Sequence, residues 1–114
     1  MTTQFHPHQW THGMNGFKLL ITYNPLTHRE LEYRRFMIQR WLPGMQELGL
    51  QPVDVMHTLW GSYPIRLIVL YAPDLDTMEE AMGGQAWQEW HEQLHTFVRN
   101  LRYRVVAART WLQF

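Results

Sequence analysis

The fold follows from residues 53–71, which read VDVMHTLWGSYPIRLIVLY. Two runs rich in β-branched, aliphatic and aromatic residues flank Gly61–Pro64, whose glycine, serine and proline favour a turn. We therefore predict a strand over Val53–Trp60, a second strand over Ile65–Tyr71, and antiparallel pairing of the two as a hairpin.

Upstream of this hairpin the sequence predicts one strand and one helix. Phe17–Tyr23 contains three consecutive aliphatic residues and is typical of a strand, which Asn24–Pro25 should end. Thr27–Glu30 has the spacing of a capping box and predicts the start of a helix. The helical apolar pattern then continues to Gly49, with an interruption expected at Pro43–Gly44.

Downstream of the hairpin the sequence predicts a second helix and a last strand. Asp76 and Thr77 are suited to cap the helix, and Gly83–Gly84 should divide it into two pieces. The strand is expected over Tyr103–Leu112. The inward stripe of the longer helical piece consists of Trp87, Trp90, His91, Leu94, Phe97 and Val98.

The resulting order of elements, β-α-β-β-α-β, is that of the ferredoxin-like α+β fold. This fold has a four-stranded antiparallel sheet with both helices on one face. We expect residues 17–114 to form this single domain, and residues 1–16, which show no periodicity, to form a loosely ordered arm ahead of it.

Composition excludes several classes of function. The ten basic and ten acidic residues among 114 cancel, which leaves no electrostatic basis for nucleic-acid binding. The absence of cysteine excludes disulfides, thiolate metal sites and cysteine nucleophiles. The longest strongly apolar run, Leu67–Ala72, is too short to cross a membrane, and residues 1–16 lack the apolar core of a secretory signal. We expect a cytoplasmic protein.

The hairpin strand over residues 65–71 is apolar on both faces. A sheet covered by helices on one side normally shows polar residues on the other. Here one face of the strand carries Ile65, Leu67, Val69 and Tyr71, and the opposite face carries Ile68 and Leu70 beside Arg66. A second copy of the sheet would cover such a face, so we expect a homodimer. The alternative is that the amino-terminal arm, with Phe5, Trp10 and Met14, covers it in a monomer.

Three segments carry a resemblance to a known superfamily. Phe36–Pro43, Thr58–Gly61 and Trp87–Trp90 resemble the corresponding parts of the dimeric α/β-barrel superfamily, and in particular NIPSNAP-like domains. The resemblance covers residues 17 to 114 and implies two ferredoxin-like sheets that close into a barrel, with a pocket between sheet and helices in each subunit. Members include cofactor-free monooxygenases, haem-degrading or haem-binding proteins, isomerases and proteins without known activity.

The haem-degrading branch of this superfamily implies candidate catalytic residues. Asn24 matches its asparagine at the end of the first strand, and His91 matches its haem-ligating histidine on the second helix. Tyr71 stands where that branch has a tryptophan, so the match is incomplete. His91 is alternatively a core histidine within the aromatic stripe of the second helix. We therefore expect no cofactor, with haem as the alternative.

A monooxygenase-like activity requires an apolar cavity with a few polar groups that hold an aromatic substrate and its anion. The alternative is that these large side chains only fill the core or the dimer interface. The candidate pocket residues are Tyr23, His57, Trp60, Arg66, Tyr71, Trp87 and His91.

Histidine spacing raises the question of a metal. Residues 91–95 read His-Glu-Gln-Leu-His, the zincin string, in which His91 and His95 lie one helical turn apart. A zinc hydrolase also needs a third ligand and a different fold, so these two histidines are weak candidates only. The histidines of the arm, His6, His8 and His12, lack a fourth ligand, and we expect no metal site.

The sequence thus predicts a small homodimeric α/β-barrel protein that binds an apolar or aromatic small molecule, with cofactor-free monooxygenase chemistry as the activity implied by the resemblance. One alternative is a non-catalytic association domain whose pocket is filled by its own aromatic side chains. The other is a protein that binds or degrades haem through His91.

Overall fold

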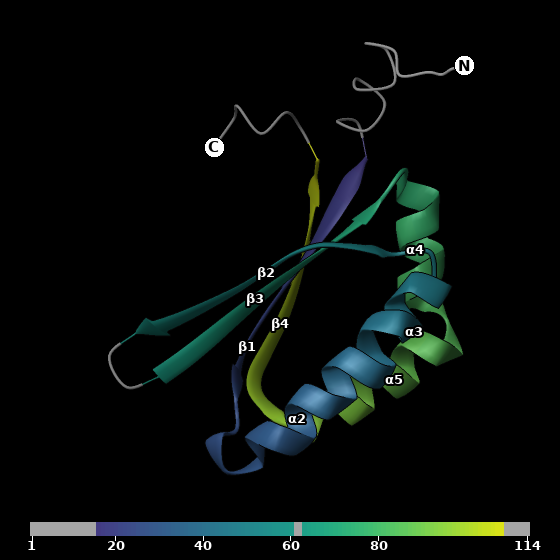
Figure 1. Ribbon diagram of the computed structural model, residues 1–114. Coiled ribbons are helices and arrows are strands. Elements are labelled where there is room, and N and C mark those ends of the chain that lie inside the picture. Colours follow the sequence, from purple (N-terminus) through teal and green to yellow (C-terminus); the bar gives the residue numbers. More distant parts are fainter. Residues whose placement is uncertain (1–15, 61–62, 109–114) are drawn as a thin grey trace, which may run out of the picture.

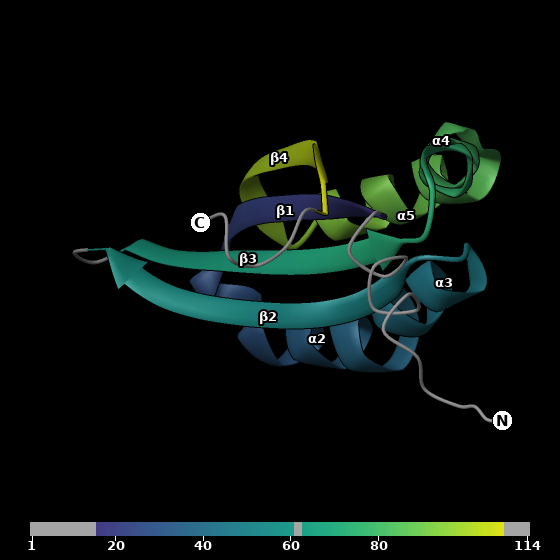
Figure 2. The same ribbon diagram turned by 90° about the horizontal axis from the view of Figure 1, so that it is seen from above.

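The computed structural model describes residues 16–60 and 63–108 (Figure 1). Its strands form one antiparallel sheet with the order β2-β3-β1-β4. The strands are β1 (Phe17–Pro25), β2 (Gln51–Trp60), β3 (Tyr63–Ala72) and β4 (Val98–Ala107). Strands β2 and β3 pair antiparallel as expected for a hairpin, and their paired ends project beyond the helices (Figures 1 and 2). The arm over residues 1–15 and the centre of the predicted turn, Gly61–Ser62, lie outside the described residues.

The helices lie together on one side of the sheet (Figure 1). The first helical stretch is continuous and consists of η1 (Thr27–Arg29), α2 (Glu30–Phe36), η2 (Met37–Trp41) and α3 (Leu42–Glu47); the second consists of α4 (Leu75–Gly83) and α5 (Gln85–His95). The predicted ferredoxin-like α+β fold, with a four-stranded sheet and helices on one face, is confirmed. No helix of the described part of the chain has both the length and the apolar character needed to cross a membrane.

The interruption expected at Pro43–Gly44 takes the form of a π-helical turn. Proline has no amide hydrogen, and its ring clashes with the carbonyl four residues earlier in an α-helix. The chain accommodates Pro43 by widening over Met37–Trp41, so that the amide of Leu42 donates to the carbonyl of Met37, five residues back. The helix therefore continues instead of stopping.

The ends of the helices agree only in part with the prediction. Gly49, with a φ of 93°, follows α3 as expected, and Gly83–Gly84 divides the second helix. The predicted capping box is wrong, because Thr27 lies inside a 3-10 turn and no side chain caps that turn or α2. The cap of α4 is Asp74 rather than Asp76: Asp74 has extended backbone angles, and its Oδ1 accepts a 2.7 Å hydrogen bond from the amide of Thr77.

Strand β4 begins five residues earlier than predicted. Phe97 and Val98, which fit a helical stripe in sequence, follow the end of α5 at His95, and Val98 already pairs with Pro25 of β1. The amide of Leu26 also donates to the carbonyl of Phe97 at 2.9 Å, which ties the start of β4 to the end of β1. The predicted end of this strand, residues 109–112, lies outside the described residues.

The core lies between the sheet and the helices. It contains alternate residues of the two central strands together with one stripe from each helical stretch. Its most deeply buried side chains are Leu19, Ile21, Tyr23, Tyr33, Trp41, Met45, Leu50, Ile68, Leu70, Met78 and Leu94.

The face of the sheet opposite the helices carries an apolar centre. Leu20 pairs with Val69 and Thr22 pairs with Leu67, so these side chains share that face, and Met56 of β2, 46% exposed, lies beside Leu67. The predicted two-sided apolar character of β3 is therefore present in the structure. Charged residues lie on this face toward both edges of the sheet, namely Arg102 and Arg104 on β4 and Asp54 on β2.

Close contact between the two helical stretches depends on Gly44. A Cβ atom built on Gly44 would lie 2.5 Å from two carbon atoms of the Trp90 ring. We expect Gly44→Ala to lower the free energy of unfolding by about 1–3 kcal/mol because Trp90 must shift, even though alanine favours helix over glycine by about 1 kcal/mol. Urea unfolding of both proteins measures the difference.

Gly83→Ala is the matched control, since Gly83 is also helical and its added Cβ would meet nothing within 4 Å. This variant should be as stable as the wild type or slightly more stable. Equal behaviour of the two alanine variants would contradict the packing role of Gly44.

Candidate functional site

Three of the predicted pocket residues form a row across the sheet. Arg66 of β3 pairs with Tyr23 of β1 on one side and with His57 of β2 on the other, so the three side chains share the helix-covered face. The alternation of side chains along each strand is enough to place them on that face. Their alignment in a row depends in addition on the register in which the strands pair.

Tyr33 of α2 completes this row from the helix layer. The hydroxyls of Tyr23 and Tyr33 lie 2.5 Å apart, and Arg66 Nη1 donates to the Tyr33 hydroxyl at 3.3 Å. The Arg66 guanidinium also lies over the Tyr33 ring, 5.4 Å from its centroid. On the other side, Arg66 Nε and Nη2 lie 3.2 and 3.0 Å from His57 Nδ1. Because a guanidinium can only donate, Nδ1 of His57 is the unprotonated ring nitrogen.

A cavity of about 270 Å³, which we call the Arg66 cavity, lies beside this row. Apolar side chains from the π-helical turn, the start of α3 and strands β2 and β3 form most of its wall, and the polar wall consists of Tyr33, Arg34 and Arg66. Arg34 Nη2 is ion-paired with Glu30 at 2.6 Å, which leaves Arg66 as the guanidinium without a carboxylate partner among the described residues. The apolar lining residues are Met37, Ile38, Leu42, Val55 and Ile68.

Both tyrosines of the row keep their protons at neutral pH. Burial raises the pKa of Tyr23 far above its usual value of 10, and the neighbouring Tyr33 raises it further. Burial also raises the pKa of Tyr33, although its hydrogen bond with Tyr23 and the charge of Arg66 act in the opposite direction. The row therefore consists of two neutral hydroxyls beside the Arg66 cation.

The available donors and acceptors determine the direction of the hydrogen bond between Tyr23 and Tyr33. Tyr23 is 2% exposed, and the Tyr33 oxygen is the one partner that the described residues give its hydroxyl. If Tyr23 donates to Tyr33, the Tyr33 oxygen accepts from both Tyr23 and Arg66, and its own proton remains available. Because Tyr33 lines the Arg66 cavity, that proton can be donated to a molecule inside it.

Trp87 and His91 belong to a second cluster on the other half of the same sheet face. His91 Nδ1 lies 2.7 Å from the Tyr103 hydroxyl, and the Trp87 and Tyr103 ring centroids lie 5.1 Å apart. Burial raises the pKa of Tyr103 above its usual value. His91 also packs against His95, with ring centroids 5.9 Å apart.

The three residues implied by the haem-degrading branch are not brought together. Asn24 lies at the end of β1, where the Asn100 amide donates to its Oδ1 at 2.7 Å. Tyr71 lies on the sheet face opposite the helices, since it pairs with Lys18 and its neighbour Leu70 is in the core. His91 lies on α5 and lines neither the Arg66 cavity nor the groove described below. Tyr71 and His91 therefore lie on different sides of the sheet, so the three residues do not line one site.

The remaining predicted residues are placed as follows. Trp60 ends β2, and its side chain lies outside the described residues. His91 and His95 share one face of α5, as their spacing predicts, but residues 16–60 and 63–108 contain no group of three or more His, Cys, Asp or Glu side chains that could hold a metal ion.

Arg66 is the one lining residue of the Arg66 cavity that the sequence predicted, and Tyr33 is the most important of those it did not. Its position in the apolar stripe of the first helix is typical of an ordinary core aromatic, and its ring is indeed 2% exposed. The signal that distinguishes it is structural: its hydroxyl meets a residue from each of two neighbouring strands.

Comparisons with known proteins establish the fold. No protein-family model matches the sequence, and no curated protein matches it significantly. The structure is similar to a NIPSNAP family protein from Agrobacterium tumefaciens, with a TM-score of 0.66 and 14% identity over 84% of this chain and 95% of that chain. It is also similar to a conserved protein from Methanosarcina mazei, with a TM-score of 0.65 and 9% identity over 88% of this chain and 99% of that chain.

A third similar structure is that of SnoaB, a cofactor-independent oxygenase from Streptomyces nogalater. The TM-score is 0.60 and the identity 12%, over 88% of this chain and 99% of that chain. At these identities the similarity is one of fold, and it confirms the fold expected from the resemblance to NIPSNAP-like domains and related oxygenases.

Proposed function

We propose that the protein binds a small apolar or aromatic molecule in the Arg66 cavity and holds an oxygen atom of that molecule against Arg66 and Tyr33. One observation carries this proposal: the Tyr33 hydroxyl and the Arg66 guanidinium, which has no carboxylate partner among the described residues, stand in the wall of a mostly apolar cavity. Binding sites for small molecules commonly combine an apolar lining with a few such polar groups.

The activity we propose for this site is cofactor-free oxygenation of an electron-rich aromatic ring. Such chemistry requires the ionised form of the substrate oxygen, because the anion gives up electrons to oxygen more readily than the neutral phenol. Arg66 supplies the positive charge and Tyr33 the hydroxyl donor that stabilise this anion. The similarity in fold to a cofactor-independent oxygenase supports the proposal.

We also propose that the working unit is a homodimer joined through the open face of the sheet. Leu20, Leu67 and Met56 on that face support it, because apolar side chains at the centre of a sheet surface favour a covering partner. A non-catalytic association domain would show the same apolar face. Ligand binding at the Arg66 cavity distinguishes the two functions.

Calorimetric titration with 4-nitrophenol tests the binding proposal. We expect Arg66→Met to weaken binding about tenfold or more, because hydrogen bonds to charged groups contribute about 1.5–3 kcal/mol. The colour of bound nitrophenol reports its ionisation, and the wild type should shift the bound phenol toward phenolate. An oxygen electrode then measures whether electron-rich phenols are consumed with oxygen.

Arg34→Met is the matched control, since Arg34 lines the same cavity but is already paired with Glu30. It should change the affinity much less than Arg66→Met. Equal affinity of wild type and Arg66→Met would contradict the proposed site, and failure of every phenol to bind would favour the association domain.

A further inference from the structure

A second cavity lies on the outer side of the helix layer, away from the Arg66 cavity. It is a groove of about 440 Å³ between the first helical stretch and α5, which we call the helix groove. None of its lining residues lines the Arg66 cavity. The groove is lined by Glu32, Arg35, Phe36, Gln39, Arg40, Gln93, Thr96 and Phe97.

Aromatic rings underlie this groove. Phe36 and Phe97 stack with centroids 5.1 Å apart and planes inclined by 26°, and Trp90 follows at 6.1 Å from Phe36. Phe36 is buried, whereas Phe97 and Trp90 remain half-exposed. Phe36 and Phe97 both line the groove, so part of their apolar ring surface is open to a ligand there.

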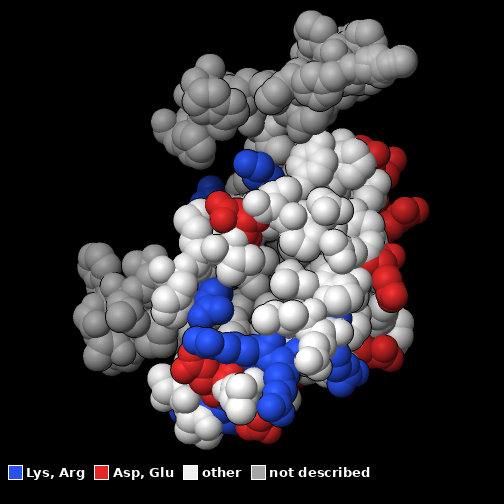
Figure 3. All heavy atoms as spheres, viewed as in Figure 1, with Lys and Arg blue, Asp and Glu red and all other residues white. Residues whose placement is uncertain are grey.

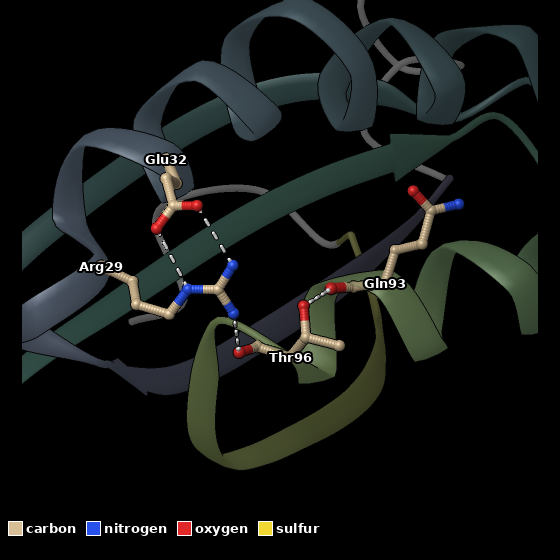
Figure 4. A network of polar contacts seen from close by, with 4 residues as sticks. All are labelled: Arg29, Glu32, Gln93 and Thr96. Atoms are coloured by element: carbon tan, nitrogen blue, oxygen red, sulfur yellow. Dashed lines mark hydrogen bonds and ion pairs between the residues drawn. The ribbon is translucent and has the colours of Figure 1, made fainter.

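One end of the helix groove is fixed by a polar network (Figure 4). Arg29 reaches from the start of the first helical stretch to the end of α5, where its Nη1 donates to the Thr96 carbonyl at 3.2 Å. Its Nε and Nη2 bind both carboxylate oxygens of Glu32, at 3.2 and 3.3 Å, and its guanidinium lies 4.5 Å from the Phe97 centroid. Glu32 and Arg29 thus neutralise each other, and Arg29 links the first helical stretch to the end of α5.

The other charges of the groove are not neutralised. Arg35 and Arg40 are exposed and have no ion pair within the described part of the chain, although Arg40 lies 5.8 Å from the Trp90 ring centroid. Figure 3 shows several basic side chains near the end of the molecule where α2 begins, with acidic ones among them, and further acidic side chains along one side of the view. Gln39 and Gln93 add amide groups that can donate.

We infer that the helix groove is a second binding site, for an amphipathic organic anion with a planar apolar body and one carboxylate or sulfonate group. The apolar body lies on Phe36 and Phe97, and the anionic group lies between Arg35 and Arg40. The volume of the groove is that of a site for one small molecule. Guanidinium groups suit the recognition of planar carboxylates, which favours this class over a neutral ligand.

Fluorescence titration with 8-anilinonaphthalene-1-sulfonate tests this site, with the uncharged analogue N-phenyl-1-naphthylamine in parallel. The wild type should bind the sulfonate more tightly than the neutral analogue. The double variant Arg35→Gln/Arg40→Gln should bind the sulfonate about fivefold or more weakly, because two charge-assisted contacts are lost. Its affinity for the neutral analogue should stay within about twofold.

Arg102→Gln/Arg104→Gln is the matched control, because it removes two exposed positive charges from the opposite face of the sheet. It should leave sulfonate binding unchanged once light scattering shows the same oligomeric mass. The inference is wrong if this control loses the sulfonate as strongly as the groove variant. It is equally wrong if the groove variant binds the sulfonate as the wild type does, or if the wild type prefers the neutral analogue.

Discussion

Leu67→Glu should convert the proposed dimer to a monomer of 13.8 kDa. Leu67 lies on a central strand, paired with Thr22 on one side and Met56 on the other, on the face opposite the helices. In the proposed dimer this position is covered by the second sheet. A carboxylate buried there without a partner costs several kcal/mol, so the dimer dissociation constant should rise about a hundredfold or more. Light scattering at micromolar concentration measures the mass.

Leu31→Glu is the matched control, because Leu31 is 63% exposed on α2 and lies away from this face. It should remain a dimer, and circular dichroism should show that both variants are folded. If the wild type itself has the mass of one chain, before and after deletion of residues 1–15, the dimer proposal is wrong. If only the deleted protein dimerises, the arm covers the face.

The sequence predicted the fold well because its strongest signals are local. The alternation in residues 65–71 places Arg66 and Ile68 on the helix side and Leu67 on the other side, as the register shows. The second helix divides at Gly84, which follows the helical Gly83 and has extended backbone angles, because glycine is a poor helix former. The predicted start of β4 is wrong because two local patterns compete there. Phe97 and Val98 continue the helical apolar pattern in the sequence, but Val98 pairs with β1 and belongs to the strand.

The candidate site could be predicted only in part, because it depends on register and on contacts between distant elements. The alternation of side chains along each strand, which can be predicted from the sequence, places Tyr23, His57 and Arg66 on the same face of the sheet. Their alignment in one row depends on the register of strand pairing, which the sequence does not determine. Tyr71 and Trp87 were grouped with them by chemistry alone. The structure places Tyr71 on the opposite face and Trp87 beside Tyr103.

Raising the pH above 10 should destabilise the protein steeply. Burial raises the pKa of Tyr23 and Tyr103 well above 10, and that of Tyr33 to a smaller degree. In the unfolded chain these hydroxyls lose their protons from about pH 10, whereas in the folded chain they keep them, so the folded state binds more protons. The stability is complete below pH 10 and is lost as the pH rises toward the folded pKa values.

Each such tyrosine lowers the free energy of unfolding by about 1.4 kcal/mol per pH unit in that window, so Tyr23 and Tyr103 together give a slope of about 3 kcal/mol per pH unit. Urea unfolding between pH 9 and 11.5 measures the slope. Tyr103→Phe, which keeps the ring beside Trp87, should reduce the slope by about a third to a half, because Tyr23 and Tyr33 still contribute, at a modest cost in stability at pH 7. An unchanged slope in that variant would show that the Tyr103 hydroxyl ionises in the folded protein as easily as in the unfolded chain, and burial would then not control its proton.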